Sequence, residues 1–189
     1  MIEAMVQPGF LLIEGTCFDA ARAWFRQHYP SQQAVSLLIN TPYATIADAG
    51  PFLLEAPPGS PIRQDWWQGD PILGQGVWLS SRLPPVKLFV SLQRRLKVQG
   101  AQDREYWLRL GDAAALLRTW ESQALWPTGF WHGVDSIWLR HQGAPLCAWK
   151  NTTPEQDAAP ANIGLAAQIV LPEALLCALS GGPEENADV

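Results

Sequence analysis

The apolar positions of this chain form short runs that alternate with stretches of helical spacing. Residues 10–14, 35–39, 52–54 and 76–80 are too short for helices and rich enough in branched and aromatic residues to be buried strands. Residues 105–110 alternate enough to predict a further strand. Because strands that alternate with helices are typical of α/β proteins, the pattern predicts an α/β body whose mixed sheet has flanking helices.

The most distinctive unit spans residues 34–56, where two predicted strands flank a helix signal. Thr41 can cap a helix, Pro42 suits its first position, and Gly50 followed by Pro51 would end it. Gly50 is expected in the left-handed conformation that is common just after a helix. These four residues therefore predict structural turns around a two-turn helix.

Further helices are predicted where a capping residue or a proline precedes apolar residues at helical spacing. Their signals begin at Thr16, Ser60, Pro84 and Asp112. The helix after Ser60 carries Trp66 and Trp67 side by side. Adjacent helix positions diverge by about 100°, so one of the two indoles is expected to be exposed or to face a second lobe.

The helix predicted for residues 85–98 separates basic side chains from an apolar stripe. The stripe consists of Pro85, Phe89, Leu92 and Leu96. Lys87 and Arg94 lie opposite the stripe, and Arg95 lies at its flank. The plain interpretation is a solvated basic face. The functional interpretation is a docking face for an acidic segment of a partner protein.

The pattern changes after residue 125. Trp126, Phe130 and Trp131 crowd a turn that contains glycine, and two apolar runs at residues 136–140 and 145–149 predict a hairpin. The aromatic cluster lies where the chain leaves the α/β body. A groove between two lobes is therefore a candidate binding site.

The rest of the chain predicts small elements only. Residues 162–170 and 172–179 are expected to form two short helices, and residues 184–189 an acidic, frayed tail. The sequence therefore predicts an N-terminal lobe over residues 1–125 and a smaller C-terminal lobe over residues 126–189, with a hairpin and short helices.

Composition restricts the class of protein. Hydrophobic residues make up 48% of the 189 residues and charged residues 16%, which provides a core and excludes general disorder. The net charge of −5 argues against nucleic-acid binding through phosphate neutralisation. No apolar run approaches the ~18 residues of a membrane span, and the N-terminus lacks the pattern of a secretory signal. A cytoplasmic protein without nucleic-acid or membrane partners is expected.

Tryptophan is the strongest compositional bias, with ten residues in the chain. Because tryptophan is favoured both in cores and at binding hot spots, the bias suggests a recognition surface without locating it. The three cysteines form no CxxC pair and leave one unmatched, which fits reduced thiols in a reducing compartment.

No residue pattern indicates catalysis. The chain has no nucleophile elbow, no metalloprotease helix, no phosphate-binding loop and no acid pair at a recognisable spacing. His28, His132 and His141 lack ligand spacing, and Cys147 lies between apolar residues, where a thiol is inert. From the residues alone we expect a protein that is not an enzyme, with no catalytic residues, no metal and no cofactor.

Five segments, taken in order, resemble the N-terminal lobe of a known family. They are a turn after a strand (37–42), a run that contains Gly-Pro-Phe-Leu (47–53), a Trp-Leu-Ser-Ser run (78–81), a helix that ends in Leu-Gln-Arg-Arg-Leu (92–96), and a strand that leads to Asp112. The family is the type VI secretion effector chaperones, or adaptors, long catalogued as a domain of unknown function. The resemblance covers residues 10–125. One difference is Ala113, where the family often has proline after the aspartate.

The resemblance implies a cytoplasmic adaptor that binds one cognate effector, keeps it soluble and helps to load it onto the spike of the secretion apparatus. In the family the C-terminal lobe varies, which implies a cargo-specific part after residue 125. The contact residues predicted with it are Trp66, Lys87, Arg94, Arg95, Trp126, Phe130 and Trp131. Two alternatives stay open: an enzyme whose active site has no motif, and a carbohydrate-binding module that stacks sugars on exposed tryptophans.

Overall fold

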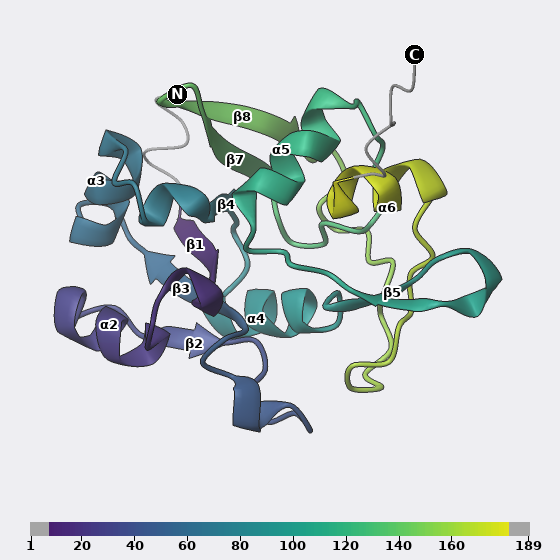
Figure 1. The fold of residues 1–189 in the computed structure, drawn as a ribbon, viewed down its shortest axis with the longest axis horizontal. Helices are drawn as coiled ribbons and strands as arrows, with labels where there is room; N and C mark the ends of the chain where they lie inside the picture. Colours follow the sequence, from purple (N-terminus) through teal and green to yellow (C-terminus); the bar gives the residue numbers. More distant parts are fainter. Residues whose placement is uncertain (1–7, 182–189) are drawn as a thin grey trace, which may run out of the picture.

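Helices cover both faces of a six-stranded sheet in the computed structural model, which describes residues 8–181 (Figure 1). The strand order is β2-β3-β1-β4-β7-β8. The strands are β1 (Gly9–Glu14), β2 (Ala34–Ser36), β3 (Pro51–Ala56), β4 (Val77–Ser80), β7 (Ser136–His141) and β8 (Ala144–Lys150). The α/β class with flanking helices is confirmed. A mixed sheet was predicted, but every strand pair of this sheet is antiparallel. Parallel neighbours would need crossover connections, and no two neighbouring strands here are joined in that way.

The central strand β1 has core on both sides. All six of its residues are buried, and their side chains alternate between two apolar clusters. Leu11 and Ile13 face α2 (Ala21–His28) and α3 (Pro61–Gln68). Phe10 and Leu12 face the cluster built with α4 (Pro85–Gln93), α5 (Ala113–Glu121) and α6 (Glu173–Ser180). This double burial explains why the strand is apolar without interruption.

A second, two-stranded sheet forms an arm beside the main one. It pairs β5 (Lys97–Gln99) with β6 (Glu105–Trp107), and Figure 1 shows it projecting away from the six-stranded sheet. The strand predicted for residues 105–110 is therefore confirmed only in its first half. Leu108 and Leu110 are buried in the large core and lead the chain into α5.

Residues 34–56 contain no two-turn helix. Between β2 and β3 the structure has a single 3-10 turn, Ala44–Ile46, because the two strands are antiparallel neighbours and need no crossover helix. Thr41 stabilises a turn instead of capping a helix. Its hydroxyl donates to the Leu38 carbonyl at 2.7 Å and accepts from the Tyr43 amide at 3.1 Å.

Gly50 is also not in the left-handed conformation that was predicted for it. It is buried where the chain enters β3 at Pro51, and a Cβ built on it would lie 2.5 Å from Leu38 Cδ1. Glycine is therefore required here by close packing rather than by a positive φ. Pro42 is exposed in the preceding turn.

The other cap signals have mixed outcomes. Asp112 caps α5 as predicted, accepting from the amides of Ala114 and Ala115 at 3.1 and 3.2 Å. The prediction of a capping box at Thr16 is wrong, because residues 15–17 form a 3-10 turn and α2 begins only at Ala21. A distant carboxylate replaces the local cap: Asp48 accepts from the Arg22 amide at 3.0 Å.

The C-terminal part joins the main sheet. The predicted hairpin is confirmed as β7 and β8, and β7 pairs with β4, so hydrogen bonding continues across residue 125. The division into two lobes at that residue stays a prediction. The helix expected at residues 172–179 is confirmed as α6, and the acidic tail lies outside the described residues.

The helix expected at residues 162–170 is wrong. Ile169 and Leu171 are buried while Val170 is 60% exposed, which is the alternation of an extended strand. This segment hydrogen-bonds both main-chain groups of Gln99 at 2.8 Å and so covers the outer edge of β5.

Candidate functional site

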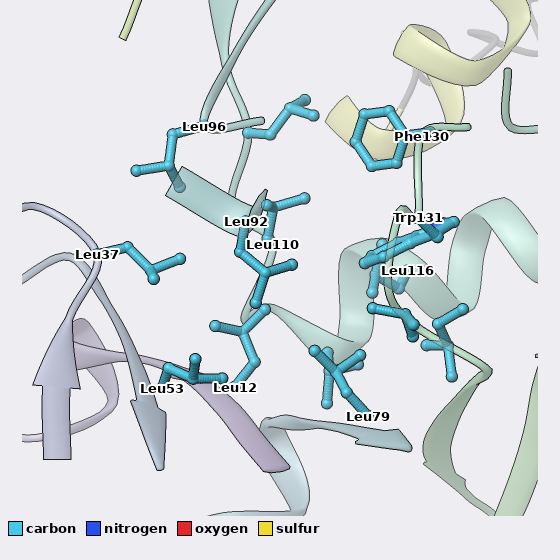
Figure 2. Packing of buried hydrophobic residues seen from close by; sticks show 14 of the residues in the cluster. Leu12, Leu37, Leu53, Leu79, Leu92, Leu96, Leu110, Leu116, Phe130 and Trp131 are labelled. Atoms are coloured by element: carbon cyan, nitrogen blue, oxygen red, sulfur yellow. The ribbon is translucent and has the colours of Figure 1, made fainter. Parts of the chain in front are cut away.

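The aromatic cluster predicted to contact a partner lies inside the protein. Phe130 is fully buried and Trp131 is 5% exposed, and both pack with leucines of the sheet and of α4 and α5 (Figure 2). Trp126 is half-buried, with its ring centroid 4.5 Å from that of Phe130 and 5.1 Å from that of Trp131. These rings stabilise the fold. Phe130 has no exposed surface, whereas Trp126 and Trp131 line a hollow of about 220 Å³ together with Trp149.

The arginine predicted at the flank of α4 is also internal. Arg95 is fully buried and donates to the carbonyls of Ser91 (2.6 Å), Phe130 and Gly129 (3.1 Å). Its guanidinium pairs with Asp157 at 2.5 Å. Arg95 therefore fastens the loop that carries the aromatic cluster to the end of α4.

Arg94 binds the same carboxylate from the other side, at 2.9 Å, and its side chain is only 13% exposed. Burial alone would raise the pKa of Asp157, but the Ala159 amide and the guanidinium groups of Arg95 and Arg94 hold it below its ordinary value. The buried face of α4 consists of Leu88, Ser91 and Leu92 and continues into Arg95. Of the predicted stripe, Leu92 and Leu96 are buried and Phe89 is half-buried, whereas Pro85 is exposed.

Most of the tryptophans are core residues. Trp66 is fully buried, while Trp67 is half-buried and packs edge-on to Trp66, Trp78 and Trp138 at 5.1–5.9 Å. The exception is Trp107 on β6, which is 46% exposed. The tryptophan bias therefore reflects the interior more than a recognition surface.

Lys87 is the one predicted contact residue that is exposed, and it follows Val86, which lines a groove. The groove has a volume of about 500 Å³ and runs between α4 and the β2–β3 edge of the main sheet. Its floor is formed by Phe10, Leu53 and Val35, which share one face of the sheet because Val35 is paired with Leu53. Figure 1 shows α4 lying next to β2 and β3.

The wall of the groove comes from the first turns of α4. Val86 is 74% exposed at the rim and Phe89 is half-buried beneath it. Near the other end, the Gln93 side-chain amide donates to the carbonyls of Leu37 and Ile39 at 2.9 and 3.2 Å, which fixes α4 to the turn after β2. Sequence reasoning missed this site because its residues come from four segments. The one available signal was Val86, an apolar residue on the polar face of the predicted helix.

A second hollow, of about 270 Å³, contains a buried carboxyl group. Glu14, at the end of β1, is 4% exposed and accepts from the Gly111 amide at 2.9 Å. Burial raises its pKa to about 7, against the opposing effects of that amide and of Arg109. Burial also raises the pKa of the Cys17 thiol in the same hollow, so this cysteine is not an activated nucleophile.

The three histidines lie apart from this hollow. The ring of His28 stacks on Trp24 with centroids 4.2 Å apart, and His132 lies 4.0 Å from Asp157.

Within residues 8–181, no three His, Cys, Asp or Glu side chains converge on a position that would hold a metal ion. In the same part of the chain, no helix has the length and apolar character needed to cross a bilayer.

The groove lies entirely within a recognised domain. Residues 9–126 match DUF4123, a domain of unknown function, and this match covers more than half of the chain. The chain belongs to the DUF4123 family. Neither the curated proteins nor the solved structures contain a match to it.

Proposed function

We propose that this DUF4123 protein is a cytoplasmic adaptor that binds a cognate effector of a type VI secretion system, keeps it soluble and helps to load it onto the secretion spike. Membership of the family over residues 9–126 is the observation that carries the proposal. The sequence resemblance described above supports the link to effector adaptors.

The groove between α4 and the β2–β3 edge supplies a surface suited to that role. Exposed apolar side chains cost free energy in water, and Val86 and Ile39 at this groove are 74% and 37% exposed. Apolar side chains of an effector would cover them. In this proposal the family-matched domain, rather than the buried aromatic cluster after residue 125, provides the first contact.

Co-expression with the protein encoded by the adjacent gene tests the function. We expect that protein to be poorly soluble alone and to co-elute with the adaptor in gel filtration when both are made together. Two well-behaved proteins that elute separately would contradict the adaptor function.

Two valines on α4 test the groove. Val86→Asp places a charge at the rim and should weaken the complex at least tenfold, while the melting temperature stays unchanged because the side chain is exposed. Val90→Asp is the matched control, since Val90 is 38% exposed on the same helix but does not line the groove. Unchanged affinity in Val86→Asp would exclude the groove as the contact surface.

A further inference from the structure

The outer edge of β6 has main-chain groups without partners in the described structure. Leu108 N donates to Leu96 O and Gly100 N donates to Arg104 O, both at 2.8 Å. Every second pair of facing residues in the arm is therefore a hydrogen-bonded pair. The intervening pairs, Lys97 with Trp107 and Gln99 with Glu105, are non-hydrogen-bonded pairs whose N–H and C=O groups point outward.

The two edges of the arm differ in what covers them. On the β5 side, the outward groups of Gln99 are bonded to residues 169 and 171. On the β6 side, the outward groups of Glu105 and Trp107 meet no other strand among residues 8–181, since β6 pairs only with β5. An open edge of this kind is a template for a strand from another chain.

A hollow of about 270 Å³ lies along the same edge, between β6, α5 and α6. Leu176 and Leu179 of α6 supply apolar lining, and Arg109 and Arg118 supply positive charge. The Arg118 guanidinium also donates to the carbonyls of Ala178 and Leu179 at 3.2 and 2.8 Å. The single carboxylate in the lining, Asp112, is already engaged with two amides of α5 and lies 3.4 Å from Arg109. The hollow therefore carries a surplus positive charge in a protein of net charge −5.

Trp107 adds an aromatic anchor beside the hollow. Its ring meets Tyr43 edge-on at 4.8 Å, and the Lys97 ammonium lies 5.1 Å from its centroid. The ring is held in place on one side while 46% of the side chain stays exposed. Fixed, partly exposed tryptophans are frequent hot spots in protein interfaces.

We propose that β6 binds an extended segment of the effector by strand addition, and that an acidic side chain of this segment enters the hollow near Arg109 and Arg118. The proposal rests on the adaptor function stated above. The outward groups of Glu105 and Trp107 specify an extended chain, because only such a chain presents matching donors and acceptors at two-residue spacing. The positive charge of the hollow specifies the carboxylate.

The test compares two substitutions at one position. Glu105→Pro removes the outward N–H but keeps the pairing with β5, because position 105 is a non-hydrogen-bonded site. Glu105→Ala removes the same side chain and keeps the N–H. With the co-expressed protein of the adjacent gene as probe, we expect the proline variant to bind at least tenfold more weakly than the alanine variant. Circular dichroism and thermal melting of each variant alone show whether the arm stays folded.

Arg109→Ala tests the charge and should weaken the complex several-fold, with the loss shrinking at high salt.

If wild type forms no complex, the adaptor function and strand addition both fail. If a complex forms and is indifferent to Glu105→Pro, strand addition fails while the adaptor function stands. If the protein alone is a dimer that the proline disrupts, the occupant of the edge is a second copy, and the proposal is overturned.

Discussion

Trp131 and Trp107 show how differently one residue type is used in two regions of this protein. Trp131 is 5% exposed in the core between the sheet, α4 and α5, whereas Trp107 is 46% exposed on an arm that projects from the sheet. The cluster around Trp131 looked like the binding surface in the sequence, because three aromatic residues are close together there. The aromatic cluster therefore belongs to the interior of this protein, and the exposed tryptophan lies on the arm.

Replacing the buried tryptophan should have the largest effect. Trp131→Ala removes an indole from the core and should lower the free energy of unfolding by ~3–5 kcal/mol. Denaturant unfolding followed by far-UV circular dichroism measures the change without relying on tryptophan fluorescence. Trp131→Phe keeps most of the apolar volume and should cost less. A loss below about 1 kcal/mol for the alanine variant would place Trp131 outside the core.

The buried arginine that fastens the aromatic loop should be nearly as important. Arg95→Met keeps the length of the side chain but removes the donor to the Ser91, Phe130 and Gly129 carbonyls and one of the donors to Asp157, which keeps Arg94 and the Ala159 amide. We expect a loss of about 3 kcal/mol in the free energy of unfolding, since breaking one side of a buried ion pair is strongly destabilising. Lys87→Met on the exposed side of α4 is the matched control and should change stability by less than ~0.5 kcal/mol. Similar values for both variants would contradict the internal role of Arg95.

Glu14 joins the end of β1 to Gly111, just before α5, and its pKa makes this contact sensitive to pH. The pKa is about 7 in the folded protein and 4.5 ordinarily, so the folded state binds more protons between these values. The free energy of unfolding should therefore fall as pH rises through this window, by up to about 3 kcal/mol at 1.36 kcal/mol per pKa unit.

Glu14→Gln removes this titration while its carbonyl can still accept from the Gly111 amide. The variant should be more stable than wild type at pH 8 and lack the decline between pH 5 and 7, as measured by urea unfolding at each pH. Glu55→Gln, at an exposed position of β3, should leave the decline in place. A decline that survives in Glu14→Gln would assign it to another group.

The exposed tryptophan should contribute least to stability. Trp107→Ala loses the edge-on contact with Tyr43 and the contact with the Lys97 ammonium, which together are expected to be worth about 1 kcal/mol or less. Thermal melting of Trp107→Ala and Trp131→Ala, measured side by side, compares the stability loss from the same substitution in the two regions. If the two losses were equal, the arm would be part of the core and unsuited to strand addition.

Local sequence patterns determined the elements whose signals are contained within a few residues. The apolar run of β1, the Asp112 cap of α5 and the β7–β8 hairpin were predicted correctly, because each depends on spacing and capping that neighbouring residues supply. The same local reasoning failed for residues 34–56. There the antiparallel pairing of β2 with β3 replaced the expected helix.

Tertiary structure alone decided which predicted contact residues are accessible. Arg95 looked solvated along its own helix, yet its carboxylate partner Asp157 lies 62 residues later in the chain. The groove likewise combines Phe10, Val35, Leu53 and Val86, which no local pattern connects. Burial and partner choice depend on which distant segments meet, so the residues fixed the elements and the packing of those elements fixed the surface.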